Sequence, residues 1–220
     1  MSSNRQIKDA LFEQVARIGK AVSSPKRLEL IELLCQAPKS VETLAREAAI
    51  SVKLASAHLK ELRNAHLVDT ERSGKQIIYR IAAQEVPHFW TLMRTLAEDR
   101  LFELQDALRN IAESAEEWRL ESREELLRKA KNGEVTVIDV RPQNEYDTKH
   151  IPFARSIPIG ELHARLAELP KETPVVAYCR GPYCLMSADA VALLKEHGYT
   201  AYRLPESVTE FSLTKLVGRQ

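Results

Sequence analysis

Apolar residues recur every three or four positions in three short stretches within the first 80 residues, which is the spacing of a buried helix face. The first stretch begins at Ser24-Pro25, a favoured pair for the N-cap and first turn of a helix. The other two begin at Ser40 and Ser51, which are also good N-cap residues. Because few residues separate these last two helices, they predict a helix-turn-helix unit. On its second helix we expect four residues to face inward: Leu54, Ala55, Leu59 and Leu62.

The residues after the third helix change to a rough alternation of apolar and polar positions on both sides of Ser73-Gly74. This alternation over residues 67–72 and 75–81 predicts an antiparallel hairpin that turns at Ser-Gly. A hairpin directly after a helix-turn-helix unit is a wing, and Arg72 and Lys75 lie at its tip. The order of elements is that of an α+β winged helix-turn-helix domain.

Residues 85–118 contain no glycine, and their only proline, Pro87, falls in the first turn, where proline is tolerated. An apolar stripe follows the helical period through this segment: Phe89, Leu92, Met93, Leu96, Leu104, Leu108 and Ile111. The pattern predicts one helix of roughly 30 residues, which is longer than a small domain usually needs. We expect this dimerisation helix to pair with a second copy of the chain or to bridge to the next domain.

From Arg123 onward, β-branched runs alternate with helical stretches. Buried strands are predicted at 135–140, 174–178 and 200–204. Helices are predicted at 124–131, 162–169 and 185–197. Such alternation predicts an α/β domain with a small parallel sheet. We therefore expect a first domain at residues 1–118 and a second domain at residues 119–220.

The composition fits this division, since 220 residues suit two domains of about 100 residues each. The N-terminus lacks the apolar run of a signal peptide, and no apolar stretch is long enough for a membrane span, so we expect a cytoplasmic protein with no membrane partner. Three cysteines are too few for a disulfide scaffold. In a reducing compartment Cys35, Cys179 and Cys184 should be thiols.

The net charge of +1 means that any DNA-binding charge must be local. Residues 51–80 carry six Lys and Arg against three Asp and Glu, whereas residues 85–129 carry seven against eleven. Residues near the start of a recognition helix meet base edges, while basic residues on its flanks and on the wing meet phosphates. An ordinary solvated helix can carry similar charge, but the order of elements favours DNA. The candidates are Ser51, Lys53, Ser56, His58, Lys60, Arg63, Arg72 and Lys75.

Three segments in this half resemble the ArsR family of winged-helix repressors: residues 24–34, 41–45 and 56–62, the last reading Ser-Ala-His-Leu-Lys-Glu-Leu. The resemblance covers residues 10 to 100. It implies a homodimer whose terminal helices pair, double-stranded operator DNA as the partner, and an inducer that releases the DNA.

Many ArsR members bind metal through a Cys-x-Cys segment on the helix before the recognition helix, but residues 40–42 here read Ser-Val-Glu. Others use clusters on the last helix, where this chain offers only His88. We therefore expect no metal site and no cofactor. Relatives that sense sulfur species use two cysteines in this domain, whereas Cys35 stands alone on an apolar helix face and is interpreted as a core thiol.

Cys179 directly follows a predicted buried strand and precedes a predicted helix. The positive end of a helix dipole and the free backbone N–H groups there favour the thiolate, which is the nucleophilic form. Arg180 adds positive charge that could attract an anionic donor, and Gly181 lets the backbone curl. An ordinary strand-to-helix turn with an incidental cysteine is the alternative. The candidate active-site loop is Cys179, Arg180, Gly181, Pro182, Tyr183 and Cys184.

The wider sequence resembles a rhodanese-like domain over residues 120 to 205, on four quoted segments: 137–142, 145–146, 150–154 and 156–158. The resemblance implies that Cys179 takes a sulfane sulfur as a persulfide and passes it to a thiol acceptor. Asp139 and Arg141 match a family pair whose role is interpreted as structural, since a buried carboxylate needs a partner. Related loops that bind phosphate or arsenate need an arginine where this chain has Leu185.

Several positions depart from the family pattern. Lys149 and Phe153 replace glycines, and Pro205-Glu206-Ser207-Val208 replaces a Gly-Gly turn. These changes leave room for weak activity. Cys184 has two interpretations that the sequence leaves even: it resolves a Cys179 persulfide or sulfenate into a disulfide, or it is a small residue facing the core.

The hypothesis that joins both halves is a dimeric repressor whose rhodanese-like domain forms a persulfide on Cys179 to sense or transfer reactive sulfur. This architecture resembles ArsR-type regulators fused to C-terminal rhodanese domains. Its partners would be operator DNA, a second copy, a sulfane-sulfur donor and a thiol acceptor. Three alternatives stay open: a sulfurtransferase enzyme with a DNA-binding anchor, a thiol–disulfide sensor built from Cys179 and Cys184, and an inert rhodanese domain.

Overall fold

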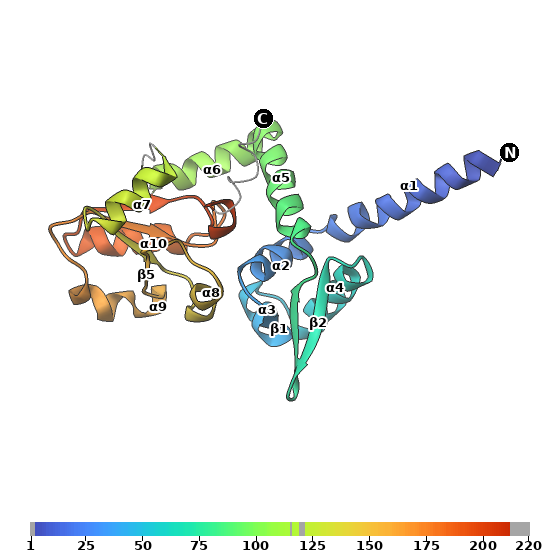
Figure 1. Ribbon diagram of the computed structural model, residues 1–220, viewed down its shortest axis with the longest axis horizontal. Helices are drawn as coiled ribbons and strands as arrows, with labels where there is room; N and C mark the ends of the chain where they lie inside the picture. Colours follow the sequence, from blue (N-terminus) through green and yellow to red (C-terminus); the bar gives the residue numbers. More distant parts are fainter. Residues whose placement is uncertain (1–2, 115, 119–121, 212–220) are drawn as a thin grey trace. The chain divides into compact units, whose positions relative to one another are not determined.

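The computed structural model describes residues 3–114, 116–118 and 122–211. They form two compact units, Met1–Thr91 and Leu92–Gln220, each of which is considered by itself (Figure 1). We expected the boundary between residues 118 and 119, which falls inside the second unit. Within the described residues, no helix is long and apolar enough to cross a membrane.

The described part of the first unit holds four helices, a three-stranded antiparallel sheet and the first part of a fifth helix. The helices are α1 (Ser3–Val22), α2 (Pro25–Gln36), α3 (Val41–Glu47), α4 (Val52–Asn64) and α5 (Glu85–Arg100). The strands are β1 (Lys39–Ser40), β2 (Val68–Ser73) and β3 (Gln76–Ile81), in the order β1-β3-β2. The predicted winged helix-turn-helix is therefore present, with α4 as the recognition helix and β2–β3 as the wing.

The predicted caps of the helix-turn-helix are largely confirmed. Ser40 Oγ accepts a hydrogen bond from the Thr43 N–H at 3.2 Å, and Ser51 Oγ accepts one from the Leu54 N–H at 3.2 Å. Ser24 is the N-cap residue of α2 but makes no such side-chain bond, and Pro25 is the first helical residue. These caps fix where α3 and α4 begin and hence which of their faces turn inward.

Three details of this unit differ from expectation. Helix α1 was not predicted. Leu54 was expected to face inward but is 43% exposed, because the capped first turn places only Ala55, Leu59 and Leu62 on the inner face of α4. The hairpin turns at Gly74-Lys75, one residue later than expected, since Ser73 pairs with Gln76 and Gly74 supplies the positive φ of +60°.

The prediction of one long helix over residues 85–118 is wrong. Helix α5 ends at Arg100, α6 runs from Phe102 to Ser114, and the segment after α6 bridges to the last strand at Arg203. Figure 1 shows α5 and α6 leaving the break in different directions. No glycine or proline marks the break, so a helical period alone could not reveal it. The apolar stripe is continuous in the sequence, but Leu96 is 59% exposed whereas Leu108 is half-buried.

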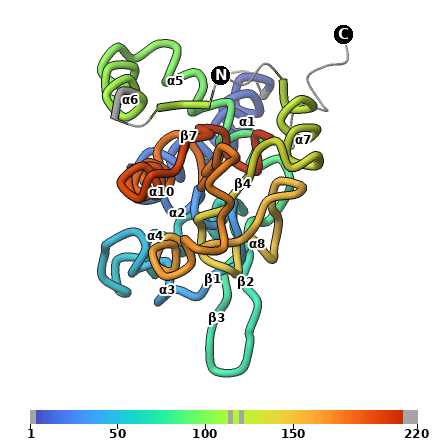
Figure 2. Tube along the Cα trace, turned by 90° about the vertical axis from the view of Figure 1, so that its left-hand side faces the viewer, coloured from blue at the N-terminus to red at the C-terminus, as the bar shows by residue number. Residues whose placement is uncertain are grey.

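The second unit contains the predicted parallel sheet, in the order β5-β4-β6-β7. Its strands are β4 (Thr136–Asp139), β5 (Arg155–Ser156), β6 (Val175–Tyr178) and β7 (Ala201–Leu204). The helices are α7 (Arg123–Lys131), α8 (Gln143–Thr148), α9 (Ile159–Leu162), the 3-10 helix His163–Glu168 and α10 (Met186–Glu196). One buried cluster joins the sheet to α9 and α10 and another joins it to α7, so helices cover both faces (Figures 1 and 2).

Two of the positions that depart from the rhodanese sequence pattern have distinct local structures. Phe153, which stands where the family usually has glycine, adopts a φ of +67° and is 54% exposed. The left-handed region is costly for a residue with a Cβ, which is a physical reason for glycine at this position. Further along, Ser207 Oγ accepts from the Glu210 N–H while Glu210 Oε2 accepts from the Ser207 N–H, so the altered C-terminal edge forms a capping box.

Candidate functional site

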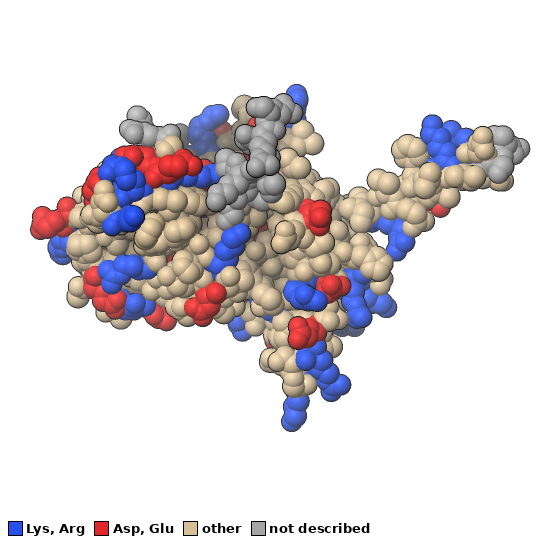
Figure 3. Space-filling model, in the orientation of Figure 1, with Lys and Arg blue, Asp and Glu red and all other residues tan. Residues whose placement is uncertain are grey.

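The predicted DNA-binding residues lie on α4 and at the end of the wing. Ser51, Lys53, Ser56, Lys60, Arg63, Arg72 and Lys75 are exposed, and His58 is half-buried. Lys and Arg side chains gather at the free end of the β2–β3 hairpin (Figure 3). Cations on a recognition helix and on a wing can pair with phosphates on both strands of double-stranded DNA.

The start of α4 holds two apolar residues that the sequence analysis did not assign to DNA. Val52 and Leu54 are 45% and 43% exposed, and they follow the capping residue Ser51. Apolar side chains at the start of a recognition helix can contact the thymine methyl group in the major groove. These residues carry no charge, so the local charge pattern in the sequence does not indicate them.

Cys179 lies at the carboxyl end of β6 and is 1% exposed. Its Sγ is 3.2 Å from Ser187 Oγ and 3.3 Å from the Cys184 carbonyl oxygen. Burial raises the pKa of the thiol, but hydrogen bonds from the Cys184 and Ser187 side chains and from the backbone outweigh burial and lower it to about 6. The thiolate therefore predominates at pH 7, which is the form that a sulfur nucleophile needs.

Cys184 has the opposite character. Its hydrogen bond to Cys179, together with burial, raises its pKa well above the usual value. All three cysteines are free thiols, and Cys35 is partly buried with its pKa raised to about 12 by burial and by the charge of Glu32. The raised pKa makes Cys184 the donor in its hydrogen bond to Cys179, and the raised pKa of Cys35 favours its thiol form at neutral pH.

The loop around Cys179 is held by charged side chains, and two of them, Glu145 and Arg203, carry no signal of this role in the sequence. Arg180 was expected to attract an anionic donor, but its Nη2 lies 2.6 Å from Oε1 of Glu145, a fully buried carboxylate, so much of its charge is compensated. Arg203 is 2% exposed and donates from Nε to Ser187 Oγ at 3.2 Å and from Nη2 to the Pro182 carbonyl oxygen at 2.8 Å.

Asp139 was expected to need a partner because it ends a buried strand, and in the structure that partner is Arg141. The two side chains form a fully buried ion pair with an Arg141 Nη2 to Asp139 Oδ2 distance of 2.6 Å. Arg141 Nη2 also donates to the Lys149 carbonyl oxygen at 2.8 Å. This pair ties the end of β4 to the following loop, as a structural role requires.

Helix α5 also reaches the Cys179 loop, through Arg94. This side chain is 4% exposed, forms ion pairs with Glu98 at 3.2 Å and with Glu210, and lies over the Tyr183 ring at 5.6 Å. Gly181 has a φ of +137°, and a Cβ there would lie 3.3 Å from Arg94 Nη1. The altered C-terminal edge, which holds Glu210, thus supplies part of the contact between α5 and the loop.

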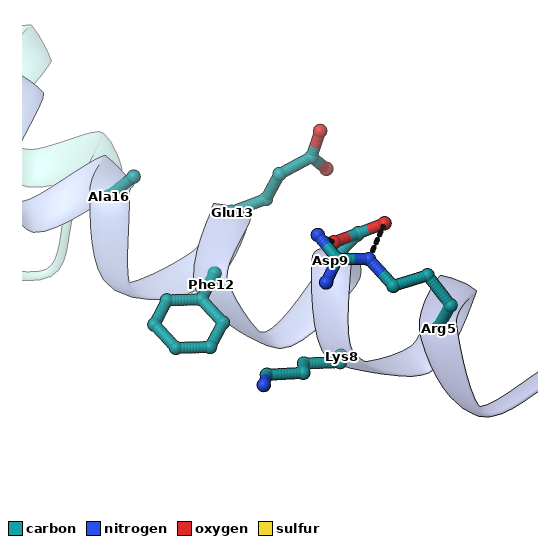
Figure 4. Close-up of a pocket in the computed structure, with 6 residues that line it drawn as sticks. All are labelled: Arg5, Lys8, Asp9, Phe12, Glu13 and Ala16. Atoms are coloured by element: carbon teal, nitrogen blue, oxygen red, sulfur yellow. Dashed lines mark hydrogen bonds and ion pairs between the residues drawn. The ribbon is translucent and has the colours of Figure 1, made fainter.

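Open cavities accompany these features. One, of about 350 Å³, lies beside the loop and is lined by Gln105, Leu108, Arg109, Ala112, Glu117, Pro182 and Arg203. Another is a shallow surface on α1 alone, where Phe12 projects from the same helix as the Arg5–Asp9 ion pair (Figure 4). The first cavity lies next to the Cys179 loop, because Pro182 and Arg203 line it. The second is lined by residues of α1 alone, whose side chains are exposed there.

A winged helix-turn-helix unit joined to a parallel α/β unit with a buried cysteine at a strand-to-helix loop is typical of a DNA-binding regulator with a rhodanese-like domain. Residues 24–70 match the family described as bacterial regulatory protein, arsR family, and residues 122–214 match the rhodanese-like domain. The chain belongs to the ArsR family of HTH-type transcriptional regulators and carries a rhodanese-like domain.

Relatives match this chain over different extents. The HTH-type transcriptional regulator Rv0324 of Mycobacterium tuberculosis is 40% identical over 216 residues, covering 98% of this chain and 95% of that protein. The HTH-type transcriptional regulator YgaV of Escherichia coli is 36% identical over 78 residues, covering 35% of this chain and 79% of that protein. The solved winged helix-turn-helix domain of Mb0332 from Mycobacterium bovis is 35% identical, covers 47% of this chain and 93% of that chain, and has a TM-score of 0.43.

Proposed function

We propose that this protein is a homodimeric repressor that takes up a sulfane sulfur on Cys179 and thereby changes its affinity for operator DNA. The observation that carries the proposal is the Cys179 sulfur, which is buried at a strand-to-helix loop and held as a thiolate by Ser187 and Cys184. A thiolate stabilised in that position is prepared for nucleophilic attack on sulfur.

The uptake step balances with thiosulfate as donor. The Cys179 thiolate attacks the outer sulfur of thiosulfate, an S–S bond forms to Cys179, and the bond to the sulfonyl sulfur breaks with its electron pair to release sulfite. The product is a Cys179 persulfide anion, and no proton or external oxidant is needed. Because Cys179 is 1% exposed, donors should be small, and the cavity beside Pro182 offers space next to the loop.

The route from sulfur to DNA is proposed to run through α5. This helix begins in the first unit at Glu85, and its second part belongs to the second unit, where Arg94 lies against Gly181 and Tyr183. Cys179 is almost fully buried in a close-packed interior, so the loop must shift to make room for an added sulfur atom. A shift of Gly181 or Tyr183 moves the surface against which the Arg94 side chain packs. The position of α5, which carries Arg94, is then expected to change.

The experiment measures operator affinity before and after treatment with thiosulfate or polysulfide, on the wild type and on Arg94→Leu. We expect donor treatment to change the wild-type affinity about fivefold or more, within the usual range of allosteric coupling, and to change that of Arg94→Leu much less. Sulfur loading of Arg94→Leu, read by intact mass, should stay normal. Equal wild-type affinities with and without bound sulfur would contradict the proposal.

The dimer surface is proposed to include α1. Ile7, Leu11, Phe12 and Val15 are 57% to 71% exposed on this helix, and a helix this apolar is rarely left uncovered. The resemblance to ArsR regulators, whose terminal helices pair, supports a second copy of the chain as the occupant. Apolar area of this kind is buried in obligate homodimers.

We expect the double variant Leu11→Glu with Phe12→Glu to be monomeric, since two carboxylates would have to be desolvated in the interface. Sedimentation velocity at micromolar concentration measures the change. Gln14→Glu is the matched control, because it adds a carboxylate at an exposed position of the same helix and should remain dimeric. A dimer that survives the double substitution would place the interface elsewhere.

A further inference from the structure

Arg203 on β7 is linked to the reactive sulfur by a chain of two short contacts. Its Nε lies 3.2 Å from Ser187 Oγ, and Ser187 Oγ lies 3.2 Å from Cys179 Sγ. All three side chains are buried, with exposures of 2% for Arg203, 0% for Ser187 and 1% for Cys179. Because water is excluded from this chain of contacts, each hydrogen bond in it has a larger effect on charge than it would at the surface.

The chemistry of the three groups fixes the direction of the contacts. A guanidinium has donors and no acceptor, so Ser187 Oγ must accept the proton of Arg203 Nε. In its thiolate form Cys179 can only accept a hydrogen bond, so the single hydroxyl proton of Ser187 is then directed to Cys179 Sγ. The negative charge on sulfur is thus paired, through one hydroxyl, with the positive charge of Arg203.

The same guanidinium also binds the loop that follows Cys179. Its Nη2 donates to the Pro182 carbonyl oxygen at 2.8 Å, and its Nη1 lies 3.3 Å from Glu117 Oε1. Arginine is suited to this task because its planar fork donates in three directions at fixed angles. Lysine has the charge but not the fork, so it cannot reproduce all three contacts.

We propose that Arg203 is a positioning residue for Cys179: through Ser187 it directs a hydrogen bond to the sulfur and keeps the sulfur in its thiolate form, while it also binds the Pro182 carbonyl of the same loop. This inference rests on the proposed function only in taking Cys179 as the nucleophile. The thiolate content of Cys179 is measurable without any sulfur donor, so the two proposals can fail separately.

The test is the pH dependence of Cys179 alkylation by iodoacetamide, which reacts with thiolate and not with thiol. Trypsin cleaves after Arg180, so Cys179 and Cys184 fall in different peptides and mass spectrometry follows each one. Wild-type alkylation should rise with pH around a midpoint of about 6. In Arg203→Met the midpoint should move upward by about one pH unit or more, because the hydrogen bond that favours the charged form is no longer directed to sulfur.

Ser187→Ala should shift the midpoint in the same direction, and the double variant should shift it no further than the larger single effect, because Arg203 acts through Ser187. Arg203→Lys keeps the charge and is the second variant if Arg203→Met does not fold; its midpoint should lie between wild type and Ser187→Ala. Arg155→Met is the control, since Arg155 lies on β5 and is paired with Glu168, and its midpoint should equal that of wild type.

An unchanged midpoint in a folded Arg203 variant, judged by circular dichroism, would overturn the inference, and so would additive shifts in the double variant. A shifted midpoint in a protein whose wild type takes up no sulfur would leave the positioning role standing and remove the proposed function. Sulfur uptake with equal midpoints would do the reverse.

Discussion

Cys179→Ser is expected to abolish sulfur loading and, with it, any response of operator binding to a sulfane donor. A serine hydroxyl at the same place is almost entirely protonated at neutral pH and forms no persulfide. Intact mass after thiosulfate or polysulfide treatment should therefore show one added sulfur atom on the wild type and none on Cys179→Ser. Operator affinity of the untreated variant should match that of the untreated wild type, because Cys179 lies in the second unit.

The pH dependence of loading follows from the pKa of Cys179. Its folded value is lowered from the usual value to about 6, so the nucleophile is present above that pH and is lost as the pH falls through it. We expect the initial loading rate to rise between pH 5 and 7 and then to level off. A rate that keeps rising to pH 9 would show that a thiol of ordinary pKa does the chemistry and would contradict the assignment of Cys179.

The variant Cys184→Ser distinguishes two mechanisms: one in which Cys179 carries sulfur as a persulfide, and one in which Cys179 and Cys184 form a disulfide. The hydroxyl can replace the thiol as a donor to Cys179, so a carrier should still load sulfur in this variant. A disulfide sensor needs Cys184 as the attacking thiolate, with hydrosulfide as the leaving group, and it would lose its response entirely. The raised pKa of Cys184 favours the carrier, because little thiolate is available at this residue.

Removing the cations of the wing is expected to give the second large effect. Arg72→Ala with Lys75→Ala should weaken operator binding by about tenfold or more near physiological salt, since each cation paired with a phosphate contributes to counterion release. The slope of log affinity against log salt should fall by about one for each phosphate that the variant no longer neutralises. Fluorescence anisotropy with labelled operator at several salt concentrations measures both quantities.

The control for the wing variant is Lys131→Ala, which removes an exposed lysine from α7 in the second unit. It should leave both affinity and salt slope unchanged. Substitutions at Val52 and Leu54 should act differently, because apolar contacts to bases change sequence preference and leave the salt slope unaltered. An unaltered salt slope in the wing variant would remove Arg72 and Lys75 from the DNA interface.

Much of this protein follows from local sequence. The serines at positions 40 and 51 indicate where helices begin, the alternation after residue 67 predicts the wing, and the β-branched runs predict three of the four strands of the parallel sheet, all but the two-residue β5. Cys179 could be found because its place, after a buried strand and before a helix, is written in the order of residues. These features depend on spacing and on neighbours a few positions away, which a linear pattern contains.

Tertiary structure alone decided the rest. The helix predicted through residue 118 breaks at Leu101 without glycine or proline, and the chain after α6 pairs with β7 instead. Arg94, Ser187 and Arg203 come from distant segments, and their ordinary residue types gave no signal until the fold placed them around the loop. The sequence by itself determined the two domain types and indicated Cys179 as the candidate nucleophile. Only folding decided which charges surround that sulfur, because electrostatic and hydrogen-bond effects depend on separation in space and not along the chain.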